Sequence, residues 1–416
     1  MPKDTLAKAA ARLSRRLDQL SRVSDERGAT TRTFLSPAMH RANVLVGGWM
    51  SGAGLTVRED RVSNLIGRLE ARRRGAKTLI LGSHLDTVRD AGRFDGTLGV
   101  LLPIAAVELI RDLGIVLPFA VEVLGFSEEE GVRFSSAYIG SKGYAGRLTK
   151  ADLRLRDASG VSLIEVLATL EGRRFTPPRP AHARDELLGY LEVHIEQGPV
   201  LEAKGRAVGI VSGIAGQTRG RVVFTGGAGH AGTTPMALRR DALAGAAEFI
   251  LAMEAYARAR APLVATVGMI SARPGAANVI PASAVMSLDV RHPVEARRFA
   301  ALAQLKKLGR AIARRRGLSF SVEVTQDNPS VACSQELSSL LARSVRRHQG
   351  DAPALASGAG HDAVIMASMA PVAMLFVRCK EGLSHHRDEF VHPRDLAAAL
   401  RVVVDFIVRL ASQSES

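Results

Sequence analysis

Cysteine, aromatic residues and long apolar runs are all scarce in this chain. Cys333 and Cys379 are the two cysteines, and their spacing matches no disulfide framework or thiolate metal site. No apolar run reaches the roughly 20 residues that a membrane-spanning helix needs. Residues 1–20 are charged and helix-like and lack the apolar stretch of a secretory signal. We therefore expect a cytoplasmic protein without a membrane partner.

Acidic residues are outnumbered by basic ones, 41 to 56, which gives a net charge of +15. The basic residues occur in short scattered clusters, and aromatic residues make up only 4% of the chain. Nucleic-acid binding usually needs a continuous basic stripe with stacking side chains, and no such stripe is present. We expect a surface that attracts small anions and no nucleic-acid partner.

The 416 residues are enough for two domains. Helical patterns alternate with short β-rich apolar runs, which favours a central sheet flanked by helices, an α/β fold. The expected helices are 4–21, 36–53 and 99–113, and the expected strands are 78–82, 119–126, 189–195 and 372–377.

The segment 214–329 has a different pattern. Strands are expected at 220–225, 263–270, 284–291 and 318–324, with helices at 236–258 and 294–316. This is the β-α-β-β-α-β order of a ferredoxin-like α+β domain. We therefore expect a catalytic domain in two parts, 1–213 and 330–416, with 214–329 inserted as a lid or dimerisation domain.

Residues of the types that commonly bind metals stand at or just beyond the ends of several apolar runs. Open α/β sheets place their active sites at such strand ends. These residues are His84, Asp95, Glu130, His194 and His385.

Most of these residues also have a purely structural interpretation. His84 and Asp86 could form a buried hydrogen bond, and Asp95 could cap the following helix. Glu128–Glu130 could be a solvated helix start, and His194 a satisfied core histidine. The combination nevertheless favours nitrogen and oxygen ligands for Zn²⁺, Mn²⁺, Co²⁺ or Ni²⁺.

The same residues suggest separate roles in metal binding and in proton transfer. The two oxygens of Asp95 can bridge two cations, and Asp86 can orient the ring of His84. Two cations about 3.5–4 Å apart activate a water and polarise a carbonyl. Glu129, beside Glu130, is the candidate general base.

Nine motifs together resemble the amidase branch of the M20 metallopeptidase superfamily, from about residue 36 to 408. They are GSHLDTV, AGRFDG, SEEEGVRF, VHIEQGPVLE, GIAGQTR, GHAGTTPM, NVIP, SGAGHDA and GLSH. The resemblance implies one cation on His84 and His194, a second on Glu130 and His385, and Asp95 between them. It also implies Glu129 as general base, with Mn²⁺ favoured and Zn²⁺ or Co²⁺ possible.

The resemblance extends to the inserted segment and to substrate contacts. It implies His230 as the stabiliser of the oxyanion, and Asn278 and Arg291 as the clamp for a substrate carboxylate. Further contacts are implied for Gln197 and for the loop Gly358, Ala359 and Gly360. A homodimer formed through the inserted domain is also implied.

The branch acts on small anionic ureido compounds and releases ammonia and carbon dioxide. The segments DTVRDAGRFDG and GIAGQTR most resemble allantoate amidohydrolases. N-carbamoyl-L-amino-acid amidohydrolase and β-ureidopropionase remain the alternatives, and an M20-type dipeptidase is a more distant one. The chain departs from the family at Arg387, where proline is usual, so His386 could replace His385 as ligand.

Overall fold

The computed structural model describes residues 3–172 and 174–414. The chain forms two compact units. The main unit consists of Met1–Ser212, Cys333–Leu355 and Gly360–Ser416, and the inserted unit of Gly213–Ala332 and Ala356–Ala359. The short segment Ala356–Ala359 therefore groups with the inserted unit, although the sequence placed it in the catalytic domain.

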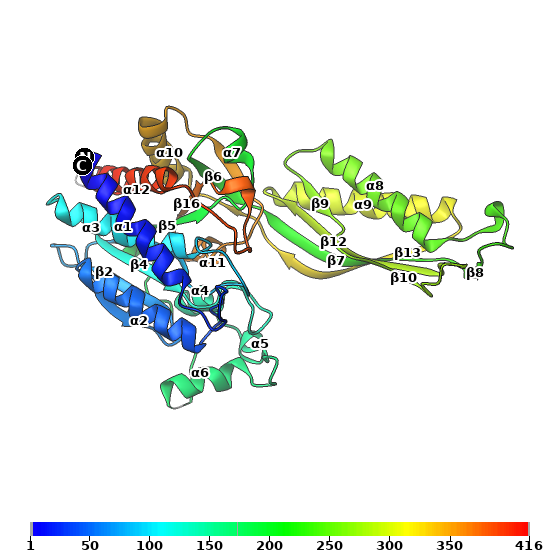
Figure 1. The fold of residues 1–416 in the computed structure, drawn as a ribbon, viewed down its shortest axis with the longest axis horizontal. Helices are drawn as coiled ribbons and strands as arrows, with labels where there is room; N and C mark the ends of the chain where they lie inside the picture. The colour runs from blue at the N-terminus through cyan, green and yellow to red at the C-terminus, as the bar shows by residue number, and fades with distance from the viewer. Residues whose placement is uncertain (1–2, 173, 415–416) are drawn as a thin grey trace. The chain divides into compact units, whose positions relative to one another are not determined.

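The main unit is built on a mixed sheet in the order β1-β2-β4-β3-β5-β16-β6. Figure 1 labels β2, β4, β5, β16 and β6 of this sheet. Its centre is parallel and consists of β4 (Ala120–Phe126), β3 (Thr78–His84), β5 (Leu187–Ile195) and β16 (Val372–Val377). The flanking strands β1 (Thr56–Glu59), β2 (Leu65–Leu69) and β6 (Val208–Ile214) are antiparallel to their neighbours, and β6 also pairs with β14 (Val331–Ala332) and β15 (Ala354–Ser357). Because the central strands are parallel, their carboxyl ends meet at one edge.

Helices flank this sheet. The longer ones are α1 (Lys3–Ser21), α2 (Pro37–Gly52), α3 (Thr97–Asp112), α10 (Gln335–Gln349) and α12 (Pro393–Ser414). The shorter ones are α4 (Ile139–Tyr144), α5 (Lys150–Leu153), α6 (Leu163–Glu171), α7 (Val200–Ala203) and α11 (Ala363–Met366), with 3-10 turns at Arg184–Glu186 and Lys380–Gly382. The start of α2 follows from its sequence, because Ser36 accepts a hydrogen bond from the Met39 N–H and Pro37 needs no such bond.

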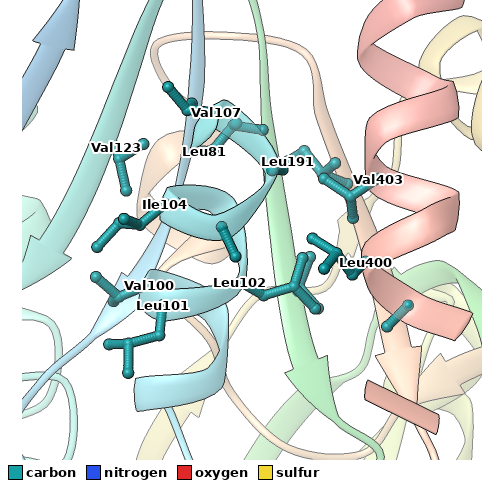
Figure 2. Packing of buried hydrophobic residues seen from close by; sticks show 14 of the residues in the cluster. Leu81, Val100, Leu101, Leu102, Ile104, Val107, Val123, Leu191, Leu400 and Val403 are labelled. Carbon is teal, nitrogen blue, oxygen red and sulfur yellow. The ribbon is translucent and has the colours of Figure 1, made fainter. Parts of the chain in front are cut away.

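The core of the main unit lies around α3, which is buried from Thr97 to Ile110. Figure 2 shows side chains of α3, such as Ile104, among those of β3 and β4 and of α12, including Leu400 and Val403. Each fully buried aliphatic side chain contributes roughly 1.5–3 kcal/mol, so this layer anchors the loop that precedes α3. That loop carries Asp95.

The inserted unit has an antiparallel sheet in the order β10-β12-β7-β13, with β9 also paired to β12. Its elements are β7 (Gly216–Thr225), β8 (Gly229–His230), α8 (Ala242–Arg258), β9 (Val264–Thr266), β10 (Ile270–Arg273), β11 (Val279–Ile280), β12 (Ser283–His292), α9 (Glu295–Arg315) and β13 (Ser319–Asn328), with a 3-10 turn at Met236–Leu238. Alternate residues of β12 are buried, and the apolar ones pack with α8 and α9. The α/β fold with an α+β insert is confirmed.

Two predicted elements of the insert were wrong in their limits. The helix expected at 236–258 begins at Ala242, because Asp241 accepts hydrogen bonds from the N–H groups of Leu243 and Ala244. The strand expected at 263–270 is split, because the Ser287 hydroxyl accepts the N–H groups of Gly268 and Met269 that a continuous ladder would use.

A membrane-crossing helix is absent from the described residues, since no helix there combines the required length with sufficient hydropathy.

Candidate metal centre

The carboxyl ends of the central strands bring the predicted ligands together. His84 is the last residue of β3, His194 lies one residue before the end of β5, and Glu130 follows β4. Ligand atoms of His84, Asp95 and His194 lie within 4.8 Å of one another, and so do those of Asp95, Glu130 and His385. Residues from distant parts of the sequence thus form one cluster with nitrogen and oxygen donors.

Asp95 lies at the centre of this cluster. Its Oδ1 is 3.1 Å from Nε2 of His194 and 3.7 Å from Nε2 of His84. Its Oδ2 is 3.1 Å from Nε2 of His385, which in turn is 3.5 Å from Oε1 of Glu130. The two oxygens of one carboxylate therefore face two separate sets of donors, which is the geometry a bridging ligand needs.

The rings of His84 and His194 are oriented by backbone carbonyls. Nδ1 of His84 is 3.0 Å from the Asp86 carbonyl oxygen, and Nδ1 of His194 is 2.9 Å from that of Ile195. A carbonyl only accepts, so each Nδ1 carries a proton. Nε2, which faces Asp95, is then the nitrogen that can bind a cation once it has lost its own proton.

The carboxylate of Asp86 has a different task from the one expected. It accepts the N–H groups of Glu129 and Glu130, each at 3.1 Å, while its nearest contact with the His84 ring is 3.5 Å. Asp86 therefore orients the ring mainly through its backbone oxygen. Its side chain fixes the loop that follows β4.

The loop between Asp95 and α3 turns at Gly96. This residue has φ 64° and ψ −53°, and the Thr97 N–H donates to the Asp95 carbonyl oxygen at 2.6 Å. These values describe a γ-turn with positive φ, a conformation that is strained for any residue with a Cβ. A Cβ at Gly96 would also lie 2.3–2.5 Å from atoms of the His84 ring. Only glycine lets Asp95 approach His84 in this way.

Buried carboxylates crowd the cluster. Burial, followed by nearby carboxylates such as that of Glu130, raises the pKa of Glu129 well above its usual value. Burial and the charge of Asp95 raise the pKa of Glu130 to about 7. A hydrogen bond to Asp95 raises the pKa of His385 to about 9. The shifts of the two glutamates mark an excess of negative charge in a largely buried cluster, and divalent cations would compensate it. The residues present therefore fit a metal centre.

Gln197 and Ser384 join the cluster at Asp95. Nε2 of Gln197 lies 3.1 Å from both Oδ2 of Asp95 and Oγ of Ser384, and Ser384 Oγ is 2.9 Å from the same Oδ2. Gln197 and His385 both hold a positive φ, 55° and 56°, and such strain often occurs at functional sites. Gln197 was expected to contact substrate, whereas Ser384 had no predicted role because a serine beside a ligand carries no distinctive signal.

His385 rather than His386 lies in the cluster. His386 belongs to none of the metal-binding groups found among the described residues. Its Nδ1 accepts the N–H of Asp388 at 3.2 Å instead.

The remaining predicted residues lie mostly in the inserted unit. His230 in β8 pairs with Val279 in β11, and the Asn278 carbonyl oxygen accepts the Ala231 N–H at 2.9 Å. The backbones of His230 and Asn278 therefore lie close together. The His230 side chain is exposed, and its Nδ1 accepts the N–H of Gly232.

Arg291 in β12 is fixed by Asp289. Its Nε and Nη2 donate to the two carboxylate oxygens at 2.8 and 2.9 Å, and its Nη1 donates to the Gly358 carbonyl oxygen at 2.5 Å. Burial alone would raise the pKa of Asp289, but the hydrogen bond and charge of Arg291 leave it below its usual value. Arg291 and Gly358 line a cavity of about 550 Å³ within the inserted unit.

The predicted glycine loop spans both units. Gly358 and Ala359 belong to the inserted unit and Gly360 to the main unit. A Cβ at Gly360 would overlap the hydroxyl of Tyr138, so a larger residue at this position would have to push the end of that side chain aside.

Known proteins resemble this chain over nearly its whole length. The family described as peptidase family M20/M25/M40 matches residues 80–409. A probable allantoate deiminase of Oryza sativa subsp. japonica is 39% identical over 94% of this chain and 87% of that protein. An N-carbamoyl-L-amino-acid amidohydrolase of Pseudomonas sp. (strain NS671) is 38% identical over 97% of this chain and 99% of that protein. An amidase of the hydantoinase/carbamoylase family from Burkholderia multivorans has a solved structure with a TM-score of 0.91, at 32% identity over 97% of this chain and 98% of that one.

Proposed function

This chain belongs to peptidase family M20/M25/M40, among the metal-dependent amidohydrolases of its hydantoinase/carbamoylase branch, and from that premise we propose that it hydrolyses a ureido C–N bond of a small carboxylate. The observation that carries this proposal is the position of Asp95 between two sets of donors, with Glu129 buried in the same cluster. Ammonia and carbon dioxide are the expected products.

Allantoate is the substrate we propose, and an N-carbamoyl-L-amino acid or β-ureidopropionate is the alternative. The resemblance of DTVRDAGRFDG and GIAGQTR to allantoate amidohydrolases supports the first choice. The identities of 39% to a probable allantoate deiminase and 38% to an N-carbamoyl-L-amino-acid amidohydrolase favour neither of these substrates over the other. One or two contacts in the pocket are enough to separate such substrates.

In this proposal His84 and His194 would hold one divalent cation, Glu130 and His385 would hold a second, and Asp95 would be a ligand to both. Mn²⁺ is the favoured metal, and Zn²⁺ or Co²⁺ would suit the same nitrogen and oxygen donors. Bound cations supply Lewis acidity, which makes a water nucleophilic near neutral pH and polarises the carbonyl under attack.

Glu129 is the proposed general base. Its carboxyl group is buried and lies in one group with His84 and Glu130. It takes a proton from the attacking water as the oxygen bonds to the ureido carbon. It then delivers that proton to the leaving nitrogen as the C–N bond breaks. The raised pKa of Glu129 favours holding the proton between these steps, and nearby cations would lower it toward the operating pH.

Arg291 is the proposed anchor for the substrate carboxylate. Its hydrogen bonds to Asp289 and Gly358 use the Nε–H, one N–H of Nη1 and one of Nη2. One N–H on each terminal nitrogen is left, and this pair suits bidentate binding of a carboxylate. Asn278 completes this clamp and His230 donates to the oxyanion, with the inserted unit acting as a lid.

Gln197 and the loop Gly358, Ala359 and Gly360 are proposed as further substrate contacts. Among the described residues, Oε1 of Gln197 is buried without a hydrogen-bond partner, so it can accept a ureido N–H. We also propose a homodimer through the inserted unit, in which His230 serves the neighbouring subunit. An active monomer would contradict that part.

The test is ammonia release by metal-stripped protein after Mn²⁺ or Zn²⁺ is added back, with allantoate and an N-carbamoyl-L-amino acid compared side by side. Protein kept in chelator is the control. Metal-dependent turnover of allantoate alone supports the proposal, and turnover of the carbamoyl amino acid alone supports the alternative. Activity on neither, with activity on dipeptides, would overturn both.

A further inference from the structure

Glu389 connects two ligand-bearing segments of the main unit. It lies four residues beyond His385, and its side chain is buried, with the residue only 1% exposed. Its Oε1 accepts the N–H of Phe94 at 2.8 Å and the N–H of Asp95 at 3.1 Å. The segment that carries one ligand of the cluster therefore holds the backbone of the central ligand, 294 residues away in sequence.

The other oxygen of Glu389 reaches the side chain of Asp95 through Ser384. Ser384 Oγ is 3.2 Å from Oε2 of Glu389 and 2.9 Å from Oδ2 of Asp95. A hydroxyl has one proton, so Ser384 donates to one carboxylate at a time, and Nε2 of Gln197 supplies a second donor to Asp95. Asp95 is thus held both at its backbone and at its carboxylate.

The lack of a side chain at Gly92 leaves room for the Glu389 side chain. A Cβ at Gly92 would lie 2.3–2.4 Å from Cδ, Cβ and Oε1 of Glu389, so a larger residue at position 92 would displace this side chain. Burying a carboxylate is costly, and an apolar side chain would fill the same volume more cheaply if packing were the sole requirement. What the carboxylate adds is a hydrogen-bond acceptor for the backbone N–H groups of Phe94 and Asp95.

We propose that Glu389 is a positioning residue that fixes the bridging carboxylate of Asp95 and thereby sets the affinity of the centre for its cations. The inference rests on the metal centre in the proposed function. Contacts that support metal ligands typically change metal affinity by about 10- to 100-fold when removed. The role of Glu389 is to act through Asp95 and not to touch metal or substrate.

The test is titration of Mn²⁺ into the metal-stripped full chain, measured by calorimetry for wild type, Glu389→Ala, Glu389→Gln and Asp388→Ala. Glu389→Ala should bind Mn²⁺ about 10- to 100-fold more weakly. Glu389→Gln should keep most of the affinity, because its Oε1 accepts the same two N–H groups. Asp388→Ala is the matched control, since Asp388 is the neighbouring acid with a side chain that is 75% exposed, and it should bind as wild type does.

Thermal unfolding of the metal-free variants separates this role from a purely structural one. Glu389→Ala that unfolds earlier but binds Mn²⁺ like wild type would overturn the inference. Glu389→Gln that loses as much affinity as Glu389→Ala would also overturn it, because charge and not the acceptor would then be responsible. If Glu389→Ala does not fold, Gly92→Ala must show the same affinity loss for the inference to stand.

The titration contains no substrate, so its outcome is independent of which ureido compound is hydrolysed. Wild-type protein that binds no Mn²⁺, Zn²⁺ or Co²⁺ would refute the metal centre and this inference together. Wild-type protein that binds Mn²⁺ but hydrolyses neither ureido substrate would leave the role of Glu389 intact and refute the proposed function alone.

Discussion

Gly96→Ala tests the close approach of Asp95 to His84. The first cost of this substitution is conformational, because alanine would have to adopt φ 64° and ψ −53°. Holding a residue with a Cβ in such a sparsely populated region costs about 1–3 kcal/mol. The second cost is steric, because the new Cβ would lie 2.3–2.5 Å from the His84 ring. Overpacking of this kind costs typically about 1–3 kcal/mol.

The two terms together predict a loss of roughly 2–6 kcal/mol in the free energy of unfolding of the main unit. Gly114→Ala is the matched control. Gly114 also has a positive φ, 68°, but a Cβ there would meet nothing within 4 Å. Its alanine variant should lose only the conformational term, about 1–2 kcal/mol.

The assay is urea unfolding of the metal-free protein, followed by the fluorescence of Trp49, the single tryptophan, which lies in α2 of the main unit. Mn²⁺ titration of the folded variants then reports on the ligand geometry, and Gly96→Ala should bind about 10- to 100-fold more weakly while Gly114→Ala is unchanged. Equal stability losses in the two variants, with equal metal affinity, would refute the packing of Gly96 against His84.

Other predictions address the chemistry, the substrate clamp, the pH dependence and the metal. Glu129→Gln should retain the fold and metal while kcat falls by about 10²- to 10⁴-fold, and retained ammonia release would remove Glu129 as the base. Arg291→Ala should raise KM by about 10- to 100-fold with a smaller effect on kcat, since a charged hydrogen bond contributes about 1.5–3 kcal/mol, and an unchanged KM would exclude Arg291 from the clamp. Burial alone would raise the pKa of Glu122, but hydrogen bonds from His182, Tyr144 and Arg68 lower it from 4.5 to about 2. The ionised Glu122 therefore contributes about 3 kcal/mol to the free energy of unfolding above pH 4.5, and this contribution is lost as pH falls toward 2. In Glu122→Gln the free energy of unfolding should depend less on pH between these two values. Chelation should abolish activity and lower the unfolding temperature, because cations at 100 times their Kd stabilise the folded state by about 2.7 kcal/mol; an unfolding temperature that does not respond to added Mn²⁺, Zn²⁺ or Co²⁺ would argue against the centre.

Local sequence patterns predicted much of the fold. The strand expected at 372–377 coincides with β16, and the helices expected at 4–21 and 36–53 correspond to α1 and α2. These elements have clear periodicity and clear end signals, such as Ser36 before Pro37. The limits of α8 and the break after β9 were missed, because they depend on the side chains of Asp241 and Ser287 rather than on periodicity.

The sequence by itself determined which donors are available and that they follow strands whose carboxyl ends share an edge. Residue types and their order were enough to predict nitrogen and oxygen ligands, the two carboxylate oxygens of Asp95 as a possible bridge, and Glu129 as a neighbouring base. Tertiary structure alone decided that the backbone oxygen of Asp86 lies closer to the His84 ring than its carboxylate does. It also decided that Gln197 and Glu389 both hold Asp95. The physical reason is that periodicity is a local property of the chain, whereas the atoms that meet in these loops depend on how the loops pack. This holds for His84 and Asp86, two positions apart, as it does for Asp95 and Glu389, 294 positions apart.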